Sequence, residues 1–175
     1  MCACMKSSLA AFLFLLVLAG CGTTPHAPYA PHAAPARITA DTFRNEQDAS
    51  PAAREVAFYA LMLLQTGYEF GGKNPESGFD CSGLVSYTFR EAAGISLEGN
   101  AASMAREGRE VAVTDLRSGD LVFFNTLGRP FSHVGIYLGR GEFVHSPNSR
   151  GRVRVEKLTN RYWSRHFEMA RTLLN

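Results

Sequence analysis

Cysteine is scarce in the larger part of this chain. Of the four cysteines in 175 residues, Cys2, Cys4 and Cys21 lie near the N-terminus and only Cys81 follows them. This distribution excludes an internal network of disulfide bonds of the kind that holds small exported domains together. Long apolar runs are also lacking, because the run at residues 7–20 is too short to serve comfortably as a permanent membrane span.

Basic and acidic residues are nearly balanced, with a formal net charge of +2. Residues 129–175 contain 9 basic and 3 acidic residues, which would suit a polyanionic partner. The alternation within residues 150–158 instead favours a strand with a solvated charged face, and no nucleic-acid-binding motif is present. We therefore expect no nucleic-acid partner. The composition, 46% hydrophobic and 19% charged, is typical of one soluble globular domain.

The first twenty residues have the pattern of an export signal. Lys6 precedes the apolar run, and small residues follow it before Cys21. The segment "LAGC" at residues 18–21 resembles the lipobox of bacterial lipoproteins, which implies a signal peptide at residues 1–20 and a lipid on Cys21. An ordinary signal peptide cleaved near Ala19 is the alternative.

The residues around this signal add three expectations. Translation could begin at Met1 or at Met5, and both starts retain the apolar run. Gly22 follows Cys21, and this pattern resembles the outer-membrane address of Gram-negative lipoproteins, so we expect the protein at the periplasmic face of that membrane. Acyl chains, at ~0.8 kcal/mol per buried methylene, would hold it there without a transmembrane helix. Residues 21–50, rich in Pro and Ala, predict a flexible tether.

Regular structure is predicted from residue 51 onward, which places one domain at residues 51–175. Ser50 has the character of an N-cap and Pro51 that of a first helical residue, so a helix is expected here. Gly67 is expected to end it. Residues 68–79, dense in Gly, Asn, Pro and Ser, predict a loop.

A second helix and a set of strands follow. Asp80 is placed to cap this helix, Gly94 to end it, and a short third helix is expected within residues 100–107. Beyond residue 119 the apolar period changes from helical to two. Helices followed by antiparallel strands predict a monomeric α+β domain with N-terminal helices packed on a five- to six-stranded sheet. The strands expected from this period are residues 121–125, 132–139, 142–146, 152–158 and 167–174.

Cys81 opens the second helix, and two interpretations of it compete. A small apolar residue packs well at a helix start, which would make the cysteine structural. Unsatisfied N–H groups and the helix dipole also favour negative charge there, so the pKa of the thiol should fall and the thiolate should become available. An unpaired thiol in an exported protein risks oxidation, which favours the functional interpretation.

A cysteine nucleophile needs a base, and the expected domain contains three histidines. His133 opens a predicted strand, and Gly135 beside it would leave room for the N-terminus of the second helix to approach. His145 ends the next strand. His166 stands in no motif, so we interpret it as an ordinary polar residue. Tyr162 and Trp163 are interpreted as core or edge aromatic residues.

The loop at residues 139–141 decides whether His133 and His145 share one face of the sheet. With a three-residue loop whose last glycine is left-handed, Leu138 pairs with Glu142 and the histidines lie diagonally on the same face, roughly 7 Å apart. With a two-residue loop they lie on opposite faces. A catalytic arrangement requires the first alternative.

Five motifs follow one another along the chain: "YEFGG", "GFDCSGLV", "SGDLVFF", "SHVGIYLG" and "FVHS". In their order and spacing they resemble the NlpC/P60 cell-wall peptidases, which are papain-like enzymes with a Cys-His-His or Cys-His-polar triad. The similarity extends over about residues 51–174. It implies a papain-like fold, a peptidoglycan partner and no cofactor.

The resemblance also implies a role for each site residue. Cys81 would be the nucleophile, His133 the general base and then acid, and His145 the residue that orients the ring of His133. Tyr68 would support the oxyanion. Zinc bound by the cysteine and the two histidines is the rival interpretation, but no fourth ligand is evident, and we expect no metal. The positions implied to line the substrate side are Asp80, Ser82 and Gly83.

The resemblance implies hydrolysis of an amide bond in peptidoglycan. The candidate bonds join D-glutamate to the diamino acid of the stem peptide, or D-alanine to the diamino acid in the cross-link. The chain departs from many relatives at Glu98–Gly99, where they have Pro-Arg, and this leaves groove shape and bond preference open. Two alternatives remain: a lipoprotein with an inactive site that binds peptidoglycan or a partner, and a thiol amidase or acyltransferase that acts on another amide or ester.

Overall fold

The computed structural model describes residues 38–43, 49–147 and 151–174. The expected signal peptide, the lipidation site Cys21 and residues 22–37 of the expected tether lie outside the described residues. Among the helices of the described ranges, none combines the length and the apolar character that a membrane span needs.

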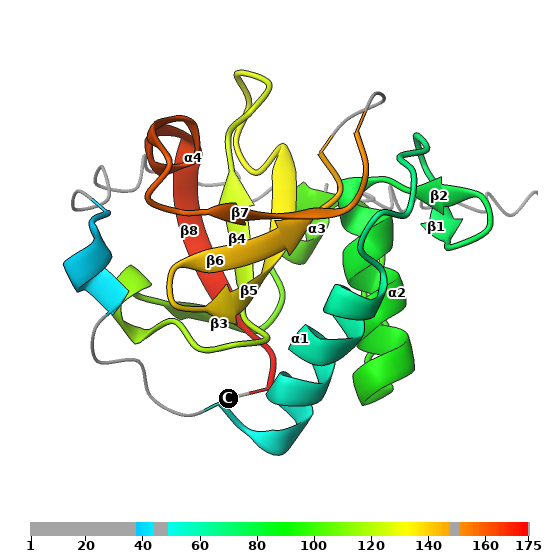
Figure 1. Cartoon of the computed structure of the whole chain (residues 1–175), viewed down its shortest axis with the longest axis horizontal. Coiled ribbons are helices and arrows are strands. Elements are labelled where there is room, and N and C mark those ends of the chain that lie inside the picture. The colour runs from blue at the N-terminus through cyan, green and yellow to red at the C-terminus, as the bar shows by residue number, and fades with distance from the viewer. Residues whose placement is uncertain (1–37, 44–48, 148–150, 175) are drawn as a thin grey trace, which may run out of the picture. The chain divides into compact units, whose positions relative to one another are not determined.

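The described residues form helices on both faces of a six-stranded antiparallel sheet, with strand order β3-β8-β4-β5-β6-β7 (Figure 1). The expected α+β class and strand number are therefore confirmed. The elements are η1 (Ala40–Phe43), α1 (Pro51–Met62), β1 (Lys73–Asn74), β2 (Gly78–Phe79), α2 (Cys81–Ala93), α3 (Ala101–Met104), β3 (Arg109–Val111), η2 (Val113–Asp115), β4 (Leu121–Phe124), β5 (His133–Gly139), β6 (Glu142–His145), β7 (Arg154–Lys157), α4 (Arg161–His166) and β8 (Phe167–Thr172).

Helix α1 begins as expected but ends early. The side chain of Ser50 accepts a hydrogen bond from the backbone N–H of the third helical residue (3.2 Å), and proline occupies the first turn. The helix ends at Met62, and the prediction of an end at Gly67 is wrong. The chain turns at Gln65, whose φ is 69°, and the N–H of Gln65 donates to the carbonyl of Val153 (2.9 Å). A tertiary hydrogen bond thus replaces the last helical turn.

Helix α2 lies beside α1 on one face of the sheet (Figure 1). Both expected caps are confirmed: Asp80 accepts from the first turn, and Gly94 is left-handed with φ 67°. The apolar side of the helix is fully buried against β5 and its neighbours, which fixes the helix start at the end of the sheet where β5 begins. The core on this face includes Val56, Leu84, Phe89, Val134, Ile136 and Met169.

Two small strand pairs were not expected from the sequence. The predicted loop at residues 68–79 contains the hairpin β1–β2, in which each strand has only two residues. Strand β3 pairs with β8 at the edge of the sheet. Strands of two or three residues show no clear alternation, so their pairing depends on the partner strand.

The second face of the sheet is covered by α4 and by residues before α1. Ile38 and Phe43 are buried, and the ring of Phe43 lies 6.0 Å from that of Tyr137. Ile38 and Phe43 belong to residues 21–50, which were expected to form a flexible tether, so packed structure starts before residue 51. Figure 1 shows η1 and α4 away from α1 and α2, across the sheet.

The hairpin between β5 and β6 has the register that a site requires. Tyr137 pairs with Phe143 and Gly139 with Glu142, with a bulge between the two pairs. Leu138 is the extra, unpaired residue of the bulge, so the expected pairing of Leu138 with Glu142 is wrong. The register on the histidine side of the bulge is nevertheless that of the first alternative. The last glycine of the loop is left-handed, with φ 76°, as expected.

Candidate active site

Asp80 organises the first turn of α2. Its Oδ1 accepts hydrogen bonds from the N–H of Gly83 (2.6 Å) and from the hydroxyl of Ser82 (2.9 Å), and its Oδ2 accepts from the N–H of Gly71 (3.0 Å). The carboxylate therefore joins the helix start to the loop before β1. This network holds Cys81 in a fixed position at the helix N-terminus.

Gly83 permits a close approach between α2 and the same loop. A Cβ at this position would lie 1.9 Å from the carbonyl oxygen of Gly72, so no side chain fits there. That carbonyl also accepts from the N–H of Asp80 (3.2 Å). The structure thus gives Asp80, Ser82 and Gly83 structural tasks, and a role of these residues in substrate binding stays a prediction.

The environment of Cys81 has two opposing effects on its pKa. Burial is the largest effect and raises the pKa of the thiol to about 11. The N–H of Val134 lowers this pKa, the carboxylate of Asp80 raises it, and the N–H groups of Ser82 and Cys81 itself lower it. The expected fall in pKa is wrong, because desolvation outweighs the helix N-terminus. Cys81 is the free cysteine of the described residues and is a neutral thiol at rest. The contact with Val134 places its sulfur beside the residue that follows His133.

The two histidines meet as the shared-face register predicts. His133 begins β5 and His145 ends β6, and His133 Nε2 lies 2.8 Å from His145 Nδ1. Both side chains are buried, with 5% and 0% exposed. The prediction that they share one face is confirmed. Gly135 follows His133 by two residues on β5, and the pairing of Ile136 with Val144 puts it opposite His145. A Cβ there would meet the ring of Phe143 at 2.7 Å, the carbonyl oxygen of Val144 at 2.9 Å and His145 Cβ at 3.3 Å. Gly135 therefore makes room for cross-strand neighbours and not, as expected, for the helix.

Burial also controls the charge of both histidines. Desolvation lowers the pKa of His133 to about 4, and the nearby carboxylate of Asp80 opposes this only partly. The pKa of His145 falls to about 2, mainly through desolvation and then through the positive charges of His133 and Arg154. Both imidazoles are consequently neutral near pH 7, as a base that accepts a proton must be.

Trp163 is a site residue whose role the sequence did not reveal. The expectation that it is a core aromatic is confirmed by its 6% exposure. Its ring also stacks on His133 (centroids 5.6 Å apart, interplanar angle 28°) and meets His145 edge-on (4.7 Å, 80°). It comes from α4, far along the chain from both histidines. No spacing rule connects it to them, and the only sequence signal is that it is the single tryptophan.

Tyr68 interacts electrostatically with Cys81, and its role in supporting the oxyanion stays a prediction. It forms an isolated bridge with Phe79, the residue that ends β2. The pKa of its hydroxyl is raised by burial first, and then by the negative charges of Asp80 and Cys81. The hydroxyl is therefore within electrostatic reach of the sulfur and remains protonated as a hydrogen-bond donor near neutral pH.

The departure at Glu98–Gly99 lies in a turn that leads into α3. Gly99 has φ 85°, which favours glycine, and Asn100 caps the helix through a hydrogen bond to the N–H of Ser103 (3.1 Å). Leu97 before it is buried. The altered residues thus form a regular helix entry, while their effect on the substrate groove stays open.

The histidine contact also bears on the zinc interpretation. Within residues 38–43, 49–147 and 151–174, no group of three His, Cys, Asp or Glu side chains is arranged to hold a metal ion. His133 Nε2 and His145 Nδ1 face each other, so these two nitrogens share one proton and do not both point to a common ion. The side chains present therefore fit proton transfer better than metal binding.

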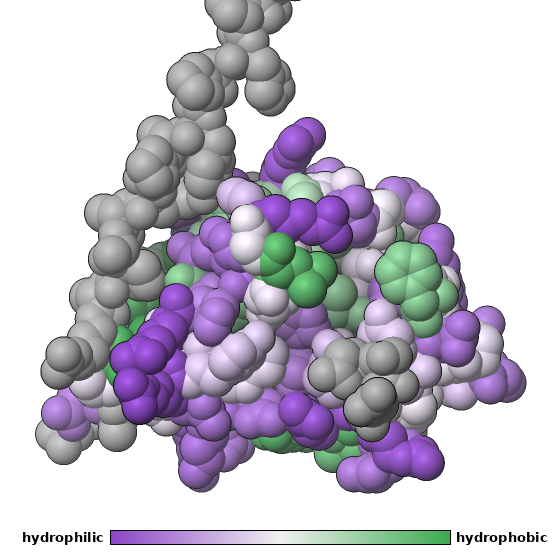
Figure 2. Space-filling view, turned by 90° about the horizontal axis from the view of Figure 1, so that it is seen from above, coloured by the Kyte–Doolittle hydropathy of each residue, from purple (hydrophilic) through white to green (hydrophobic). Residues whose placement is uncertain are grey.

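Seen from the end where β5 and α2 begin, the surface is largely hydrophilic with separate apolar groups (Figure 2).

Comparison with known proteins agrees with this arrangement. The model of the NlpC/P60 family matches residues 65–172. The chain is 39% identical over 126 residues to murein DD-endopeptidase MepH of Escherichia coli (strain K12), which covers 70% of this chain and 46% of that protein. It is 40% identical over 118 residues to gamma-DL-glutamyl hydrolase of Bacillus subtilis (strain 168), which covers 66% and 28%. The chain thus matches about half or less of these relatives.

Solved structures give the same result for the fold. The NlpC/p60 domain of peptidoglycan hydrolase SagA superposes with a TM-score of 0.61 at 29% identity, covering 69% of this chain and 98% of that chain. The expected fold is thereby confirmed, and the family model alone spans more than half of the sequence. The thiol at the start of α2, the paired histidines and these similarities lead to one conclusion: the chain belongs to the NlpC/P60 family.

Proposed function

We propose that this protein is a cysteine endopeptidase that hydrolyses an amide bond in peptidoglycan. The observation that carries the proposal is the arrangement of three side chains at one end of the sheet. The sulfur of Cys81 lies at the N–H of Val134, and the adjacent His133 is held through Nε2 by His145. A thiol, a neutral imidazole and an orienting partner are the parts that thiol acyl transfer requires.

The first step is proton transfer from Cys81 to His133. Because Nε2 of His133 contacts His145, the thiol proton goes to Nδ1. His133 must then carry its resting proton on Nε2, and this N–H donates a hydrogen bond to Nδ1 of His145. The proton of His145 is consequently on its Nε2. That Nε2 is buried without a partner among the described residues. Since the thiol is neutral at rest, we propose that proton transfer and attack on the carbonyl carbon occur together.

The remaining steps conserve atoms and charge. The Cys81 sulfur bonds to the carbonyl carbon, and the resulting oxyanion is stabilised by the N–H groups at the helix start and by the Tyr68 hydroxyl. His133 returns the proton to the leaving nitrogen, the C–N bond breaks, and an acyl thioester remains on Cys81. Water, deprotonated by His133, then cleaves the thioester and restores the thiol.

The name of MepH supports peptidoglycan as the substrate, and the relatives leave two bonds as candidates. MepH is named a murein DD-endopeptidase, which favours the D-alanine cross-link, whereas the relative from B. subtilis is named a gamma-DL-glutamyl hydrolase, a name that states a γ-glutamyl bond and not peptidoglycan. The two relatives are equally similar to this chain, at 39% and 40% identity. The products of digestion therefore have to identify the bond.

A test uses the full chain, purified in detergent, and its Cys81→Ala variant. Each is incubated with purified peptidoglycan, and the soluble products are resolved by mass spectrometry. We expect new free amines at one defined bond with the parent and none with the variant. If both proteins bind peptidoglycan equally and neither cleaves it, the enzyme hypothesis is wrong and the alternative of a peptidoglycan-binding lipoprotein holds.

We further propose that a lipid on Cys21 anchors the protein at the periplasmic face of the outer membrane. The support is the sequence "LAGC" followed by Gly22. The Cys21→Ser variant should lose the lipid mass on its N-terminal peptide and move from the membrane fraction to the soluble fraction. A parent protein that carries no lipid at Cys21 would rule out this anchor.

A further inference from the structure

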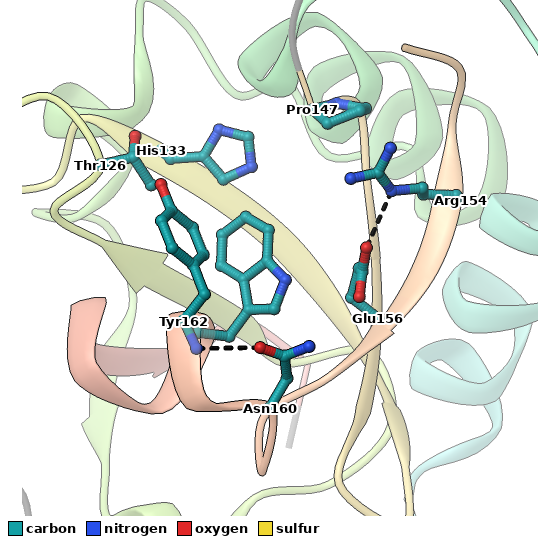
Figure 3. Close-up of a pocket in the computed structure, with 8 residues that line it drawn as sticks. Thr126, His133, Pro147, Arg154, Glu156, Asn160 and Tyr162 are labelled. Atoms are coloured by element: carbon teal, nitrogen blue, oxygen red, sulfur yellow. Dashed lines mark hydrogen bonds and ion pairs between the residues drawn. The ribbon is translucent and has the colours of Figure 1, made fainter.

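A pocket of about 350 Å³ lies beside His133, on the side of the ring that faces α4 and β7. Figure 3 shows His133 and Tyr162 on one side of it and Arg154 with Glu156 on the other. Cys81 is not among its lining residues. The pocket therefore extends the site on the histidine side and away from the nucleophile.

Its position relates it to the leaving group. In the proposed mechanism His133 gives its proton to the amine that departs, so the amine half of the substrate must lie on the His133 side of the scissile bond. A pocket that His133 itself lines offers space for the residue that carries this amine. Trp163 and Asn160 also line the pocket, so it combines apolar and hydrogen-bonding groups.

A positive group with free hydrogen-bonding capacity stands in this pocket. Arg154 Nε donates to Glu156 Oε1 (2.9 Å), and the two side chains are 48% and 24% exposed. Figure 3 shows the outer nitrogens of the guanidinium turned away from Glu156 and toward the pocket. Arg154 also lies opposite His145 in the β6–β7 register, and its charge lowers the pKa of that histidine. Glu156 thus holds one edge of the guanidinium and leaves the other edge to a ligand.

We infer that this pocket is a carboxylate-binding subsite for the amine-side residue of the substrate. The outer guanidinium edge of Arg154 binds a free carboxylate on the residue that bears the scissile nitrogen, and Glu156 fixes the orientation of the guanidinium. The inference rests on the proposed function and deepens it. The enzyme then prefers an amine-side residue with a free carboxylate to the same residue with a carboxamide. A carboxamide has no charge to pair with Arg154.

The test compares two synthetic stem peptides that differ only in this group, one with a free carboxylate and one with a carboxamide on the amine-side residue. The parent should cleave the carboxylate form with a kcat/KM about 10- to 100-fold higher, the range for one charged hydrogen-bonded contact. Arg154→Gln should lose this preference by slowing only the carboxylate form. Lys157→Gln, an exposed position on the same strand, should keep it.

A binding measurement separates failure of the subsite from failure of the proposed function. The Cys81→Ala variant should bind the intact carboxylate peptide about 10- to 100-fold more tightly than the carboxamide, and Cys81→Ala with Arg154→Gln should bind both alike. Such binding without cleavage by the parent would support the subsite and overturn the peptidase. Equal cleavage and equal binding of the two peptides would overturn the subsite alone. An equal loss for both peptides in Arg154→Gln would also overturn it, since Arg154 would then act only through His145.

Discussion

The two halves of the active site are built from different groups. Backbone atoms surround Cys81: N–H groups point at the sulfur, and the Gly72 carbonyl packs directly on Gly83. Aromatic rings surround the histidines, with Trp163 stacked on His133 and edge-on to His145. The first construction fixes a position through hydrogen bonds, and the second removes water.

Burial nevertheless has one consequence for both halves. It raises the pKa of Cys81 to about 11 and lowers the pKa of His133 to about 4. In each case the neutral form is favoured, because the charged form loses its hydration. The helix N-terminus therefore does not by itself ionise the thiol, so activation must come when His133 accepts the proton.

Removal of the base should have the largest effect. His133→Gln should lower kcat/KM for peptidoglycan fragments by about 10²- to 10⁴-fold, because the neutral thiol then has no proton acceptor. His166→Gln is the matched control, since the half-buried His166 contacts the carbonyl of Tyr162 on α4 and neither of the two site histidines. Product release measured by mass spectrometry gives the rates. Parent-like turnover of His133→Gln would show that the thiol ionises without this histidine.

A side chain at position 83 should disturb the half of the site around Cys81, where backbone atoms make the contacts. Gly83→Ala brings a methyl group against the Gly72 carbonyl, where only 1.9 Å is available, and should lower the free energy of unfolding by about 3 kcal/mol. Gly67→Ala is the control, because a Cβ there meets nothing within 4 Å. Urea unfolding midpoints compare the two. Equal stability of both variants would contradict the close approach.

The two halves of the site should lose stability in opposite directions of pH, the histidine half toward acid and the Cys81 half toward alkali. Both histidines have folded pKa values below the ordinary 6.5, so the unfolded chain takes up protons first as the pH falls below 6.5. Stability should fall from pH 6.5 toward pH 4, by about 2 kcal/mol for each histidine at pH 5. The pKa of Cys81 is raised above 9.0, so its contribution is complete below pH 9 and falls by about 1 kcal/mol at pH 10.

Urea midpoints measured from pH 5 to pH 10 would show this plateau and its two limits. His133→Gln should remove about half of the loss at the acid limit, because His145 retains its own contribution, and Cys81→Ala should flatten the alkaline limit. A parent protein that is as stable at pH 5 as at pH 7.5 would mean that the histidines are not buried in their neutral form.

Much of the fold was predictable because its signals are local. Ser50 and Asp80 cap the helices as expected, and the period-two segments all became strands of the sheet. The bulge at Leu138 was not predictable, since either loop length fits the same glycines. The end of α1 at Met62 was also missed, because the hydrogen bond that replaces its last turn goes to a residue far along the chain.

The same distinction applies to the site. The motif around Cys81 could be predicted, because a helix start is set by neighbouring residues. The shared face of His133 and His145 was one of two alternatives, and the bulge at Leu138 selects it. The stacking of Trp163 and the pocket lined by Arg154 could not, since α4 and β7 reach the histidines only through the folded sheet.

The α+β class, the caps, the strands and the candidate nucleophile and histidines could all be recognised from the order of the amino acids. Packing of distant segments makes these groups neutral, encloses the histidine pair with an aromatic ring and places a charged pocket beside it. The physical reason is range: caps and strand periods depend on residues a few positions apart, whereas desolvation and pocket walls depend on every segment that packs around a group.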